Sequence, residues 1–391
     1  MTNTSKPTMV FIAACMGMLS FGIVVITIGS LLPGILQEFN IGEAEAGGLT
    51  SVLPLGIVLG SLVFGPLADR FGYKMQFIIC SLMVMAGLEG IAYTGSLFLL
   101  NVSAFLIGLG GGVLNGATNA VVADISEKDK GSSLSLLGVF YGIGALGMPA
   151  LIGVLSNIFS VEQIITVVGG FICIMSIFFM TIPFPEPKQK QGFPLKEGGK
   201  LLKQPIILLA GMLLFFASAT EGLFNNWTTL FLTENGSASG NRALYVLSTM
   251  MLAMTVMRLF LGGILKRFTP YRVLYLLLLV VLTGCVLLFY SQTFIAALVA
   301  AIFIGAGLAS TFPVVLGYVA ENFPKLSGTA FSIVLVMALT GNMVSNYSLG
   351  QAADRWGMSW FPMIGFALTV ALMGVLGVLV KNIKKKTNST L

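Results

Sequence analysis

The chain has 391 residues, of which 56% are hydrophobic and only 9% are charged, and its formal net charge is +6. A soluble domain carries about a quarter charged residues, so this composition excludes an ordinary soluble fold and indicates a protein that crosses a membrane several times. Histidine is absent, which excludes imidazole catalysis and imidazole metal ligation, and the four cysteines lack the spacing of a metal site.

A helix crosses the hydrocarbon core of a bilayer with about 20 mainly apolar residues. Runs of this length follow one another along the chain, so the sequence predicts an all-α integral membrane protein with twelve transmembrane helices. The predicted limits are 9–36, 46–68, 75–94, 97–123, 132–156, 161–183, 205–232, 242–265, 272–290, 293–320, 328–350 and 360–380. The first run is longer than the apolar core of a signal peptide, about 7–15 residues, so we interpret it as a span.

The basic residues favour one orientation of these spans. An even number of spans places both termini on one side, and most of the Lys and Arg residues fall in the loops and the tail of that side. Because positively charged loops stay in the cytoplasm, we expect both termini to be cytoplasmic, in a plasma (bacterial inner) membrane. The basic residues are spread over several loops, so we expect no nucleic-acid partner.

Three predicted spans carry polar residues whose role the sequence leaves open. Glu89, in the outer half of the third span, is a candidate for ion or proton coupling or a side chain that only reaches the interface. Asn115 and Asn119 share one face of the fourth span, and Asn342 and Asn346 share one face of the eleventh. Each asparagine pair is a candidate for binding substrate hydroxyls or for bonding a neighbouring helix.

The seventh span contains the most unusual polar group, in the segment SATEGLFNNWTTLFL at 218–232. An ionised carboxylate at that depth costs about 2.5–3.5 kcal/mol, so we expect Glu221 to face a cavity and to take a cation or a proton. We predict that Glu221 also contacts the substrate, together with Asn225 one turn later and with Asn226 and Trp227 beside it, the Trp227 ring by stacking. Arg258 in the eighth span needs an acceptor, and is a coupling residue, a structural ion-pair partner of Glu221, or a side chain that snorkels.

The chain divides into two halves that match each other. The longest break, at 183–205, is charged and separates six predicted spans from six. Gly65 and Gly262, Arg70 and Arg267, and Asp124 and Glu321 correspond at one constant offset of 197 residues. We therefore predict an N-terminal six-helix bundle (1–185), a cytoplasmic loop (186–204), and a C-terminal bundle with a short basic tail (205–391), related by a pseudo-two-fold axis.

The segment GPLADRFGYKM at 65–75, between spans two and three, resembles the loop signature of the major facilitator superfamily. This resemblance covers the whole chain and implies a transporter that works by alternating access. It also implies that the loop acts as a conformational latch that breaks when the two halves rock. The residues that match the signature are Gly65, Asp69, Arg70, Gly72 and Lys74.

Three further segments resemble spans seven, eight and ten of the fucose/glucose/galactose:cation symporter group. They are TEGLFNNW at 220–227, MRLFLGG at 257–263 and GLASTFPVVLGYVAE at 307–321. This resemblance implies sugar uptake driven by a cation. The chain departs from the fucose-type members in span four, where Asn115 and Asn119 stand in place of an acid.

Taken together, these patterns predict a secondary transporter that takes up a hexose-like monosaccharide with protons or sodium ions. The expected partners are the substrate, the coupling cation and the lipid bilayer, and we expect a monomer without cofactor, metal site or catalytic residues. An ATP-driven pump is excluded because the phosphate-binding signature GxxxxGK[ST] is absent.

Three alternatives remain open at this stage. The 20 Met and 29 Phe residues are compatible with a drug or amphiphile efflux antiporter, whose cavity would be apolar. A membrane sensor or scaffold that transports nothing is a second alternative. A membrane-embedded enzyme is the least supported, because the sequence offers no Ser/His/Asp set and no metal cluster.

Overall fold

The computed structural model describes residues 7–125, 130–185, 201, 204–323 and 327–388, apart from a few side chains within these ranges. All regular elements of this part are helices. They are α1 (Pro7–Phe39), α2 (Glu43–Tyr93), α3 (Leu97–Ile125), α4 (Lys130–Leu155), α5 (Val161–Thr181), α7 (Pro205–Glu234), α8 (Asn241–Arg267), α9 (Pro270–Phe289), α10 (Phe294–Leu308), α11 (Thr311–Asn322), α12 (Ser327–Trp356), the 3₁₀ turn η1 (Met358–Trp360) and α13 (Phe361–Asn388).

The described residues form 12 helical segments that are long and apolar enough to cross a membrane, which confirms the predicted number of spans. The second and third predicted spans make up α2, which a kink at Gly72 divides into two helices. The tenth is divided into α10 and α11, whose boundary lies at Ala309 and Ser310. Pro313 follows this boundary and lacks the N–H that would continue the helical bonding.

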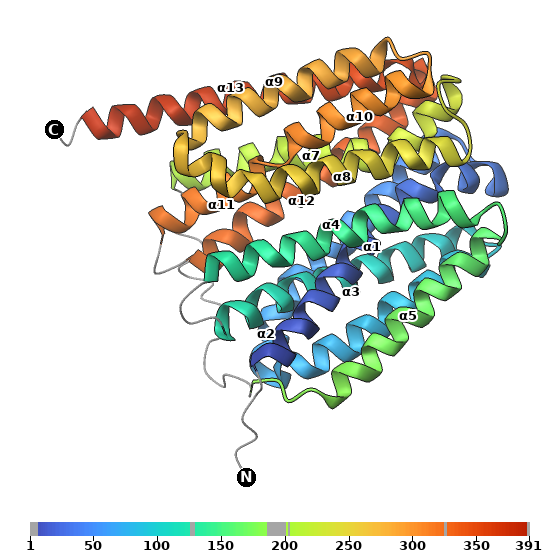
Figure 1. The fold of residues 1–391 in the computed structure, drawn as a ribbon, viewed down its shortest axis with the longest axis horizontal. Coiled ribbons are helices and arrows are strands. Elements are labelled where there is room, and N and C mark those ends of the chain that lie inside the picture. The colour runs from blue at the N-terminus through green and yellow to red at the C-terminus, as the bar shows by residue number, and fades with distance from the viewer. Residues whose placement is uncertain (1–6, 126–129, 186–200, 202–203, 324–326, 389–391) are drawn as a thin grey trace.

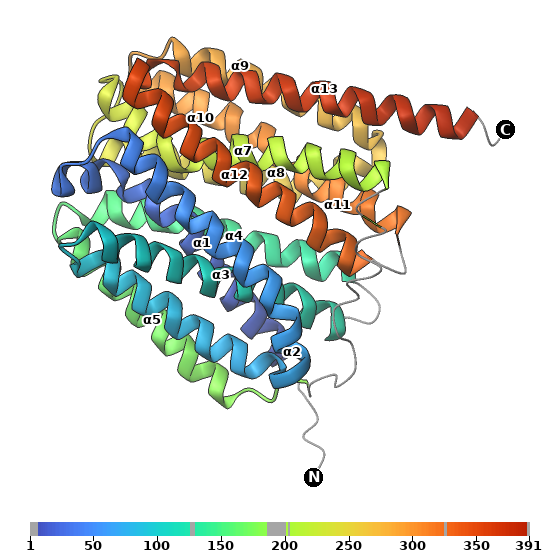
Figure 2. The same cartoon turned by 180° about the vertical axis from the view of Figure 1, so that it is seen from behind.

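Figures 1 and 2 show the helices side by side in two groups, α1–α5 and α7–α13. Within the first group α2 packs on α3 and α1 on α4, and within the second α7 packs on α12 and α9 on α10. Three helix pairs join the groups, namely α2 with α12, α4 with α8, and α1 with α7. The predicted linker falls largely on 186–200 and 202–203, outside the described residues, so its boundaries stay a prediction.

The turn between the second and third spans depends on one glycine. Gly72 interrupts α2 with φ 74° and ψ 172°, in a region that side chains rarely occupy. The neighbouring Tyr73 hydroxyl donates to Asp124 Oδ2 at 2.8 Å, which ties this turn to the end of α3. Gly72 thus provides the chain reversal between the two spans of α2. Both spans can then pack within the first group of helices.

The internal repeat predicted from the sequence recurs as matching backbone contacts. A Cβ atom at Gly108 would overlap the carbonyl oxygen of Leu53, and one at Gly305 would overlap that of Met250. Both members of each pair are separated by the same 197 residues. Gly87 and Gly284 are corresponding positions of the repeat and make equivalent contacts in their own groups. The same holds for Gly110 and Gly307. Small residues let helix backbones approach closely in membranes, so both groups use the same packing scheme.

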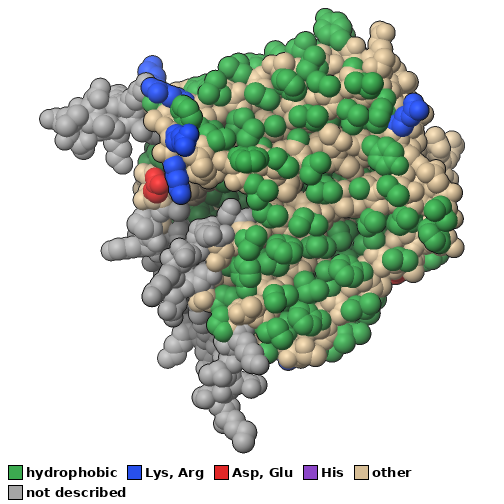
Figure 3. Space-filling view, in the orientation of Figure 1, with side chains coloured by type: hydrophobic (Ala, Val, Ile, Leu, Met, Phe, Trp, Pro, Cys, Tyr) green, Lys and Arg blue, Asp and Glu red, His purple; other side chains and the backbone are tan. Residues whose placement is uncertain are grey.

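The two ends of the molecule differ in charge. Pro7 at the start of α1 and Asn388 at the end of α13 lie toward one end, here called the basic end (Figure 1). Figure 3 shows apolar side chains over the wide face and most of the visible Lys and Arg at this end. An apolar belt bounded by charge is the surface of a protein embedded in a bilayer, so the chain is a multi-pass membrane protein. The other end is called the opposite end below.

The repeat contacts predict a difference between two glycines of the second group. Gly305→Ala places a methyl group against the carbonyl of Met250, whereas a Cβ at Gly262 meets no atom within 4 Å. Overpacking costs about 1–3 kcal/mol, so we expect Gly305→Ala to lower the midpoint of thermal unfolding in detergent. Gly262→Ala is the matched control, because both changes add the same methyl to a helix. Equal midpoints for the two variants would contradict the packing role of Gly305.

Candidate functional site

Glu221 lies about midway along α7 and is partly exposed. Two polar side chains act on its carboxylate. The hydroxyl of Tyr141 on α4 is its hydrogen-bonding neighbour, and the guanidinium of Arg258 on α8 lies within electrostatic range. The site therefore draws on both groups of helices, since α4 belongs to the first group and α7 and α8 to the second.

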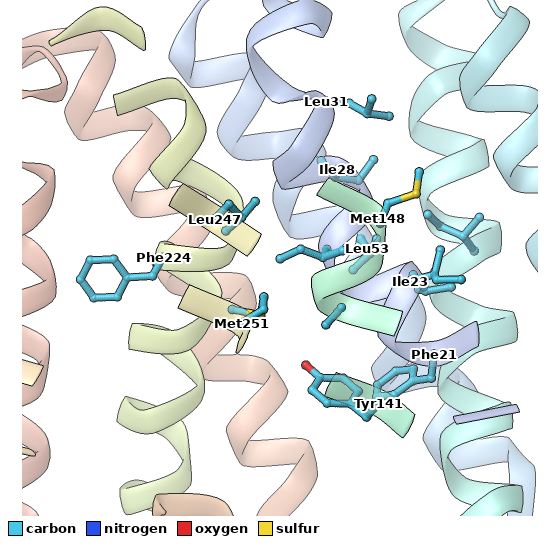
Figure 4. Close-up of a cluster of buried hydrophobic side chains, with 14 of the residues drawn as sticks. Phe21, Ile23, Ile28, Leu31, Leu53, Tyr141, Met148, Phe224, Leu247 and Met251 are labelled. Atoms are coloured by element: carbon cyan, nitrogen blue, oxygen red, sulfur yellow. The ribbon is translucent and has the colours of Figure 1, made fainter. Parts of the chain in front are cut away.

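Tyr141 is held in place by close contacts on either side of α4. A Cβ at Gly22 of α1 would overlap the carbonyl oxygen of Tyr141, and one at Gly142 would overlap the side chain of Thr255 on α8. The rings of Phe21 and Tyr141 lie 5.7 Å apart. In Figure 4 Tyr141 stands beside Phe21 with its hydroxyl turned toward the helices of the second group. The position of this hydroxyl is therefore fixed by the packing of α4 between α1 and α8.

Arg258 packs against the ring of Tyr141. Its Cζ atom lies 5.6 Å from the ring centroid, within the range of a cation–π interaction. Its Nε atom is buried, and no hydrogen-bond partner for it is found among the described residues. A buried N–H without an acceptor is costly, so the site holds a donor that a substrate oxygen or a displaced carboxylate would satisfy.

Asn342 joins this region from α12. A Cβ at Gly222 would overlap the amide group of Asn342, which places that side chain against the residue next to Glu221. Asn342 is partly exposed, and its Oδ1 accepts a bond of 2.7 Å from Asn346 Nδ2. Of the predicted site residues, the structure places Arg258 within electrostatic range of Glu221, and it places Asn342 against Gly222, the next residue along α7.

Three other predicted substrate-binding residues form a buried network between α7 and α12. Trp227 Nε1 donates to Asn346 Oδ1 at 2.8 Å, and Asn226 Nδ2 donates to the same oxygen at 3.0 Å. All three side chains are at most 4% exposed, so in this conformation they bind one another. Their contact with a substrate stays a prediction. Asn225 is also buried, and its Oδ1 has no partner among the described atoms.

The remaining polar residues predicted for the spans lie elsewhere. Asn119 Nδ2 donates to the carbonyl and the side-chain oxygen of Asn115 at 2.8 and 3.1 Å, on a partly exposed stretch of α3 near the basic end. Glu89 lies where α2 meets α5, and Thr166 Oγ1 donates to it at 3.1 Å. This hydrogen bond joins two helices of the first group.

The loop residues that match the family signature lie at the basic end. Arg70 is exposed and stacks on Phe71, 5.2 Å from the ring centroid. A Cβ at Gly65 meets no atom within 4 Å, and Lys74 is partly exposed. The side chain of Asp69 lies outside the described part of the chain, so the proposed latch stays a prediction.

Tyr141 was missed by the sequence reasoning. It lies in the segment FYGIGALGMP at 140–149, which contains a Tyr well inside a span. Tyr in membrane proteins usually lies at the interface, where its hydroxyl reaches water. A Tyr that lies one helical turn or more inside a span therefore indicates that its hydroxyl has a hydrogen-bonding partner within the protein.

Hydrogen bonds join the two groups across the opposite end. Asn241 at the start of α8 accepts from Ser156 Oγ at 2.7 Å and donates to Asn157 Oδ1 at 3.0 Å. Tyr245 donates to the carbonyl of Gly153 at 2.9 Å. Three further bonds between the groups are those of Ser51 with the Met343 carbonyl, of Thr229 with the Gly29 carbonyl and of Ser248 with the Leu146 carbonyl. These bonds are called the outer closure below.

Glycines bring the backbones together in the outer closure. A Cβ at Gly29 of α1 would overlap the Asn225 carbonyl of α7, and Gly47 of α2 and Gly350 of α12 lie directly against each other. The two groups therefore meet without intervening side chains at these points. Leu247, Met251 and Met148 fill the space between α8 and α4 (Figure 4).

Comparisons with known proteins agree with this architecture. The profile of the Major Facilitator Superfamily matches residues 10–345 and 217–390. Over 185 residues the chain is 25% identical to the multi-drug resistance efflux pump PmrA of Streptococcus pneumoniae serotype 4. That match covers 46% of each chain, so the chain spans about half the length of this curated relative.

Two solved structures share the fold over nearly the full length. A mutant of the nucleoside transporter NupG superposes with a TM-score of 0.81 at 15% identity, covering 95% of this chain and 99% of that chain. A D-xylose-proton symporter superposes with a TM-score of 0.77 at 17% identity, covering 93% of this chain and 97% of that chain. At such low identity these likenesses concern the fold alone.

Because Asn241 takes part in the outer closure, we expect Asn241→Ala to raise the fraction of molecules that are open at the opposite end. The change removes two hydrogen bonds between the groups, each contributing about 1 kcal/mol, so we expect a several-fold rise in the open population. A single cysteine introduced by Leu247→Cys, in a background without the native cysteines, reports this opening, because Leu247 is fully buried. Its rate of labelling by a membrane-impermeant thiol reagent is the measurement. Thr283→Ala is the control, since Thr283 bonds only within α9. Equal labelling in both variants would refute the closure.

Proposed function

Because the chain belongs to the Major Facilitator Superfamily, we propose that it takes up a hexose-like monosaccharide together with protons or sodium ions. It is a transporter and not an enzyme. The observation that carries the proposal is the carboxylate of Glu221, a partly exposed residue placed midway along a span and within interaction range of Tyr141 and Arg258. A carboxylate in that position is costly unless a cation or proton compensates it.

In this proposal Glu221 binds the coupling cation. Arg258 already brings one positive charge within electrostatic range, but its guanidinium packs over the Tyr141 ring. The carboxylate therefore keeps part of its affinity for a proton or a metal cation. A cation that binds one conformation more tightly than the other drives the transporter between them.

The substrate class follows from the polar groups around the carboxylate. Asn342 offers an amide, Tyr141 a hydroxyl and Arg258 an unpartnered N–H. Such a mixture of donors and acceptors suits the several hydroxyls of a sugar. Asn115 and Asn119 lie elsewhere, on α3, and their contact with a substrate stays a prediction. The resemblance to the fucose/glucose/galactose:cation symporter group and the fold shared with a D-xylose-proton symporter support the same class.

The direction of opening follows from the charge of the two ends. We place the basic end, with both termini, in the cytoplasm of a bacterial inner membrane, because basic loops remain on that side. In this proposal the outer closure lies on the external face, and substrate reaches Glu221 from the cytoplasm while the closure is formed. The closure must break, and a contact at the basic end must form, for uptake to begin. We propose that one chain suffices for this cycle.

Drug efflux is the second candidate function. The partial similarity to the efflux pump PmrA favours it, and so do the apolar side chains of Leu247, Met251 and Met148 between the two groups. An exporter of amphiphiles would bind its substrate to these side chains and would not need a set of hydroxyl-binding groups.

Uptake into liposomes tests the proposal. We expect labelled glucose to accumulate under an inward proton or sodium gradient, and Glu221→Gln to abolish accumulation because an amide cannot bind the cation. Glu221→Gln should still exchange labelled for unlabelled sugar, since the side chain keeps its shape. Glu89→Gln is the matched comparison, because it removes the other carboxylate predicted to couple and lies at the α2–α5 contact.

The outcomes separate the candidates. Accumulation by Glu221→Gln equal to that of the parent would exclude this residue from coupling. Absence of glucose uptake in the parent would exclude glucose as the substrate. Pentoses and nucleosides would then be tested in the same assay. Gradient-driven transport of a lipophilic dye without any sugar transport would establish efflux instead.

A further inference from the structure

Tyr141 touches both charged side chains of the site with different parts of its side chain. The face of its ring lies under the guanidinium of Arg258, 5.6 Å from the Cζ atom. Its hydroxyl is the hydrogen-bonding neighbour of Glu221. Both charged residues belong to the second group of helices, whereas Tyr141 belongs to the first.

The backbone of Tyr141 moves with the first group. Its carbonyl lies so close to Gly22 that no Cβ fits between α1 and α4 there, and its ring packs on Phe21 of the same helix α1. Glu221 and Arg258 sit on α7 and α8, which belong to the other group. A rocking motion that separates α4 from α8 must therefore remove the ring from Arg258 and the hydroxyl from Glu221 at the same time.

Few other charges act on the carboxylate. The groups that influence Glu221 among the described residues are Arg258 and Tyr141. Apart from Arg258, the described helices packed against α7 carry charged residues only toward their ends. These are Glu38 on α1, Arg242, Lys266 and Arg267 on α8, Glu321 on α11, and Asp354 and Arg355 on α12, and on α13 the first is Lys381. From α12 the neutral amide of Asn342 faces the same region. Removal of Tyr141 thus changes the surroundings of Glu221 more than any movement of a distant charge.

We propose that Tyr141 is a positioning residue that makes the cation affinity of Glu221 depend on the conformation of the protein. With the outer closure formed, the hydroxyl bonds the carboxylate and the ring holds Arg258. With the groups separated, the carboxylate loses that donor and Arg258 is free to turn toward it. A cation shifts a conformational equilibrium only if it binds the two states with different affinity, and Tyr141 supplies this difference. The inference rests on the proposed coupling role of Glu221.

Two substitutions separate the two contacts of Tyr141. Tyr141→Phe keeps the ring over Arg258 and removes the hydroxyl, whereas Tyr141→Leu removes both. Tyr245→Phe is the matched control, because it also deletes a Tyr hydroxyl that bonds across the groups, but one that bonds the carbonyl of Gly153. Each variant is purified as the full chain and placed in liposomes.

Transport gives the first readout. We expect the cation concentration for half-maximal uptake to shift by up to about tenfold in Tyr141→Phe, the effect of one hydrogen bond to a charged group. Tyr141→Leu should exchange sugar but accumulate none. Tyr245→Phe should change the rate and leave the cation dependence as in the parent. Parental cation dependence in both Tyr141 variants would overturn the inference, whatever their rates.

A second readout does not depend on the substrate. The cysteine introduced by Leu247→Cys is labelled over a range of pH and sodium concentrations, and we expect the labelling rate of the parent to change with one of them. The midpoint of that change should move in Tyr141→Phe and the change should vanish in Tyr141→Leu. If no sugar is transported but this pattern is seen, the sugar assignment fails and the role of Tyr141 stands. Equal midpoints in parent and variants would refute the role of Tyr141 even if sugar accumulates.

Discussion

The cost of placing charge in hydrocarbon governs the arrangement of this chain. Each uncompensated charge in a span costs about 2.5–3.5 kcal/mol, and the chain confines most of its ionisable groups to the two ends. Glu221 and Arg258 are exceptions, and they lie within electrostatic range of each other and on either side of one tyrosine. The rest of the site follows from this constraint, because the polar groups that accompany them come from helices which must pack closely enough to exclude lipid.

The two groups of helices share a scaffold but not their polar residues. Equivalent glycines allow equivalent backbone contacts, as at Gly108 and Gly305. The position that matches Glu221 in the first group is Val24, and the position that matches Arg258 is Ser61. The charged pair is therefore an addition to the second group and not a requirement of the packing. The first group contributes Tyr141, so the charged region lies on the boundary at which the groups move against each other.

Much of the fold could be predicted from the sequence, and the misses have physical reasons. The apolar runs predicted the spans, because length and hydropathy suffice in a bilayer, but they could not show that the chain reverses between spans two and three at Gly72 or that the tenth span divides before Pro313. The helical spacing placed Glu221 and Asn225 on one face, yet the bond from Trp227 to Asn346 joins residues 119 apart. Such pairings depend on the rotation of each helix, which a single sequence leaves undetermined.

The glycine contacts of the outer closure have a consequence for the electrochemical gradient across the membrane. Where Gly29 meets the carbonyl of Asn225, and where Gly47 meets Gly350, the backbones approach too closely for a water molecule to fit between them. A file of hydrogen-bonded water would carry protons through the protein without any substrate and would short-circuit the cell's energy supply. Glycine at these positions therefore keeps water out of these two contacts, and a larger residue there would separate the backbones and admit it.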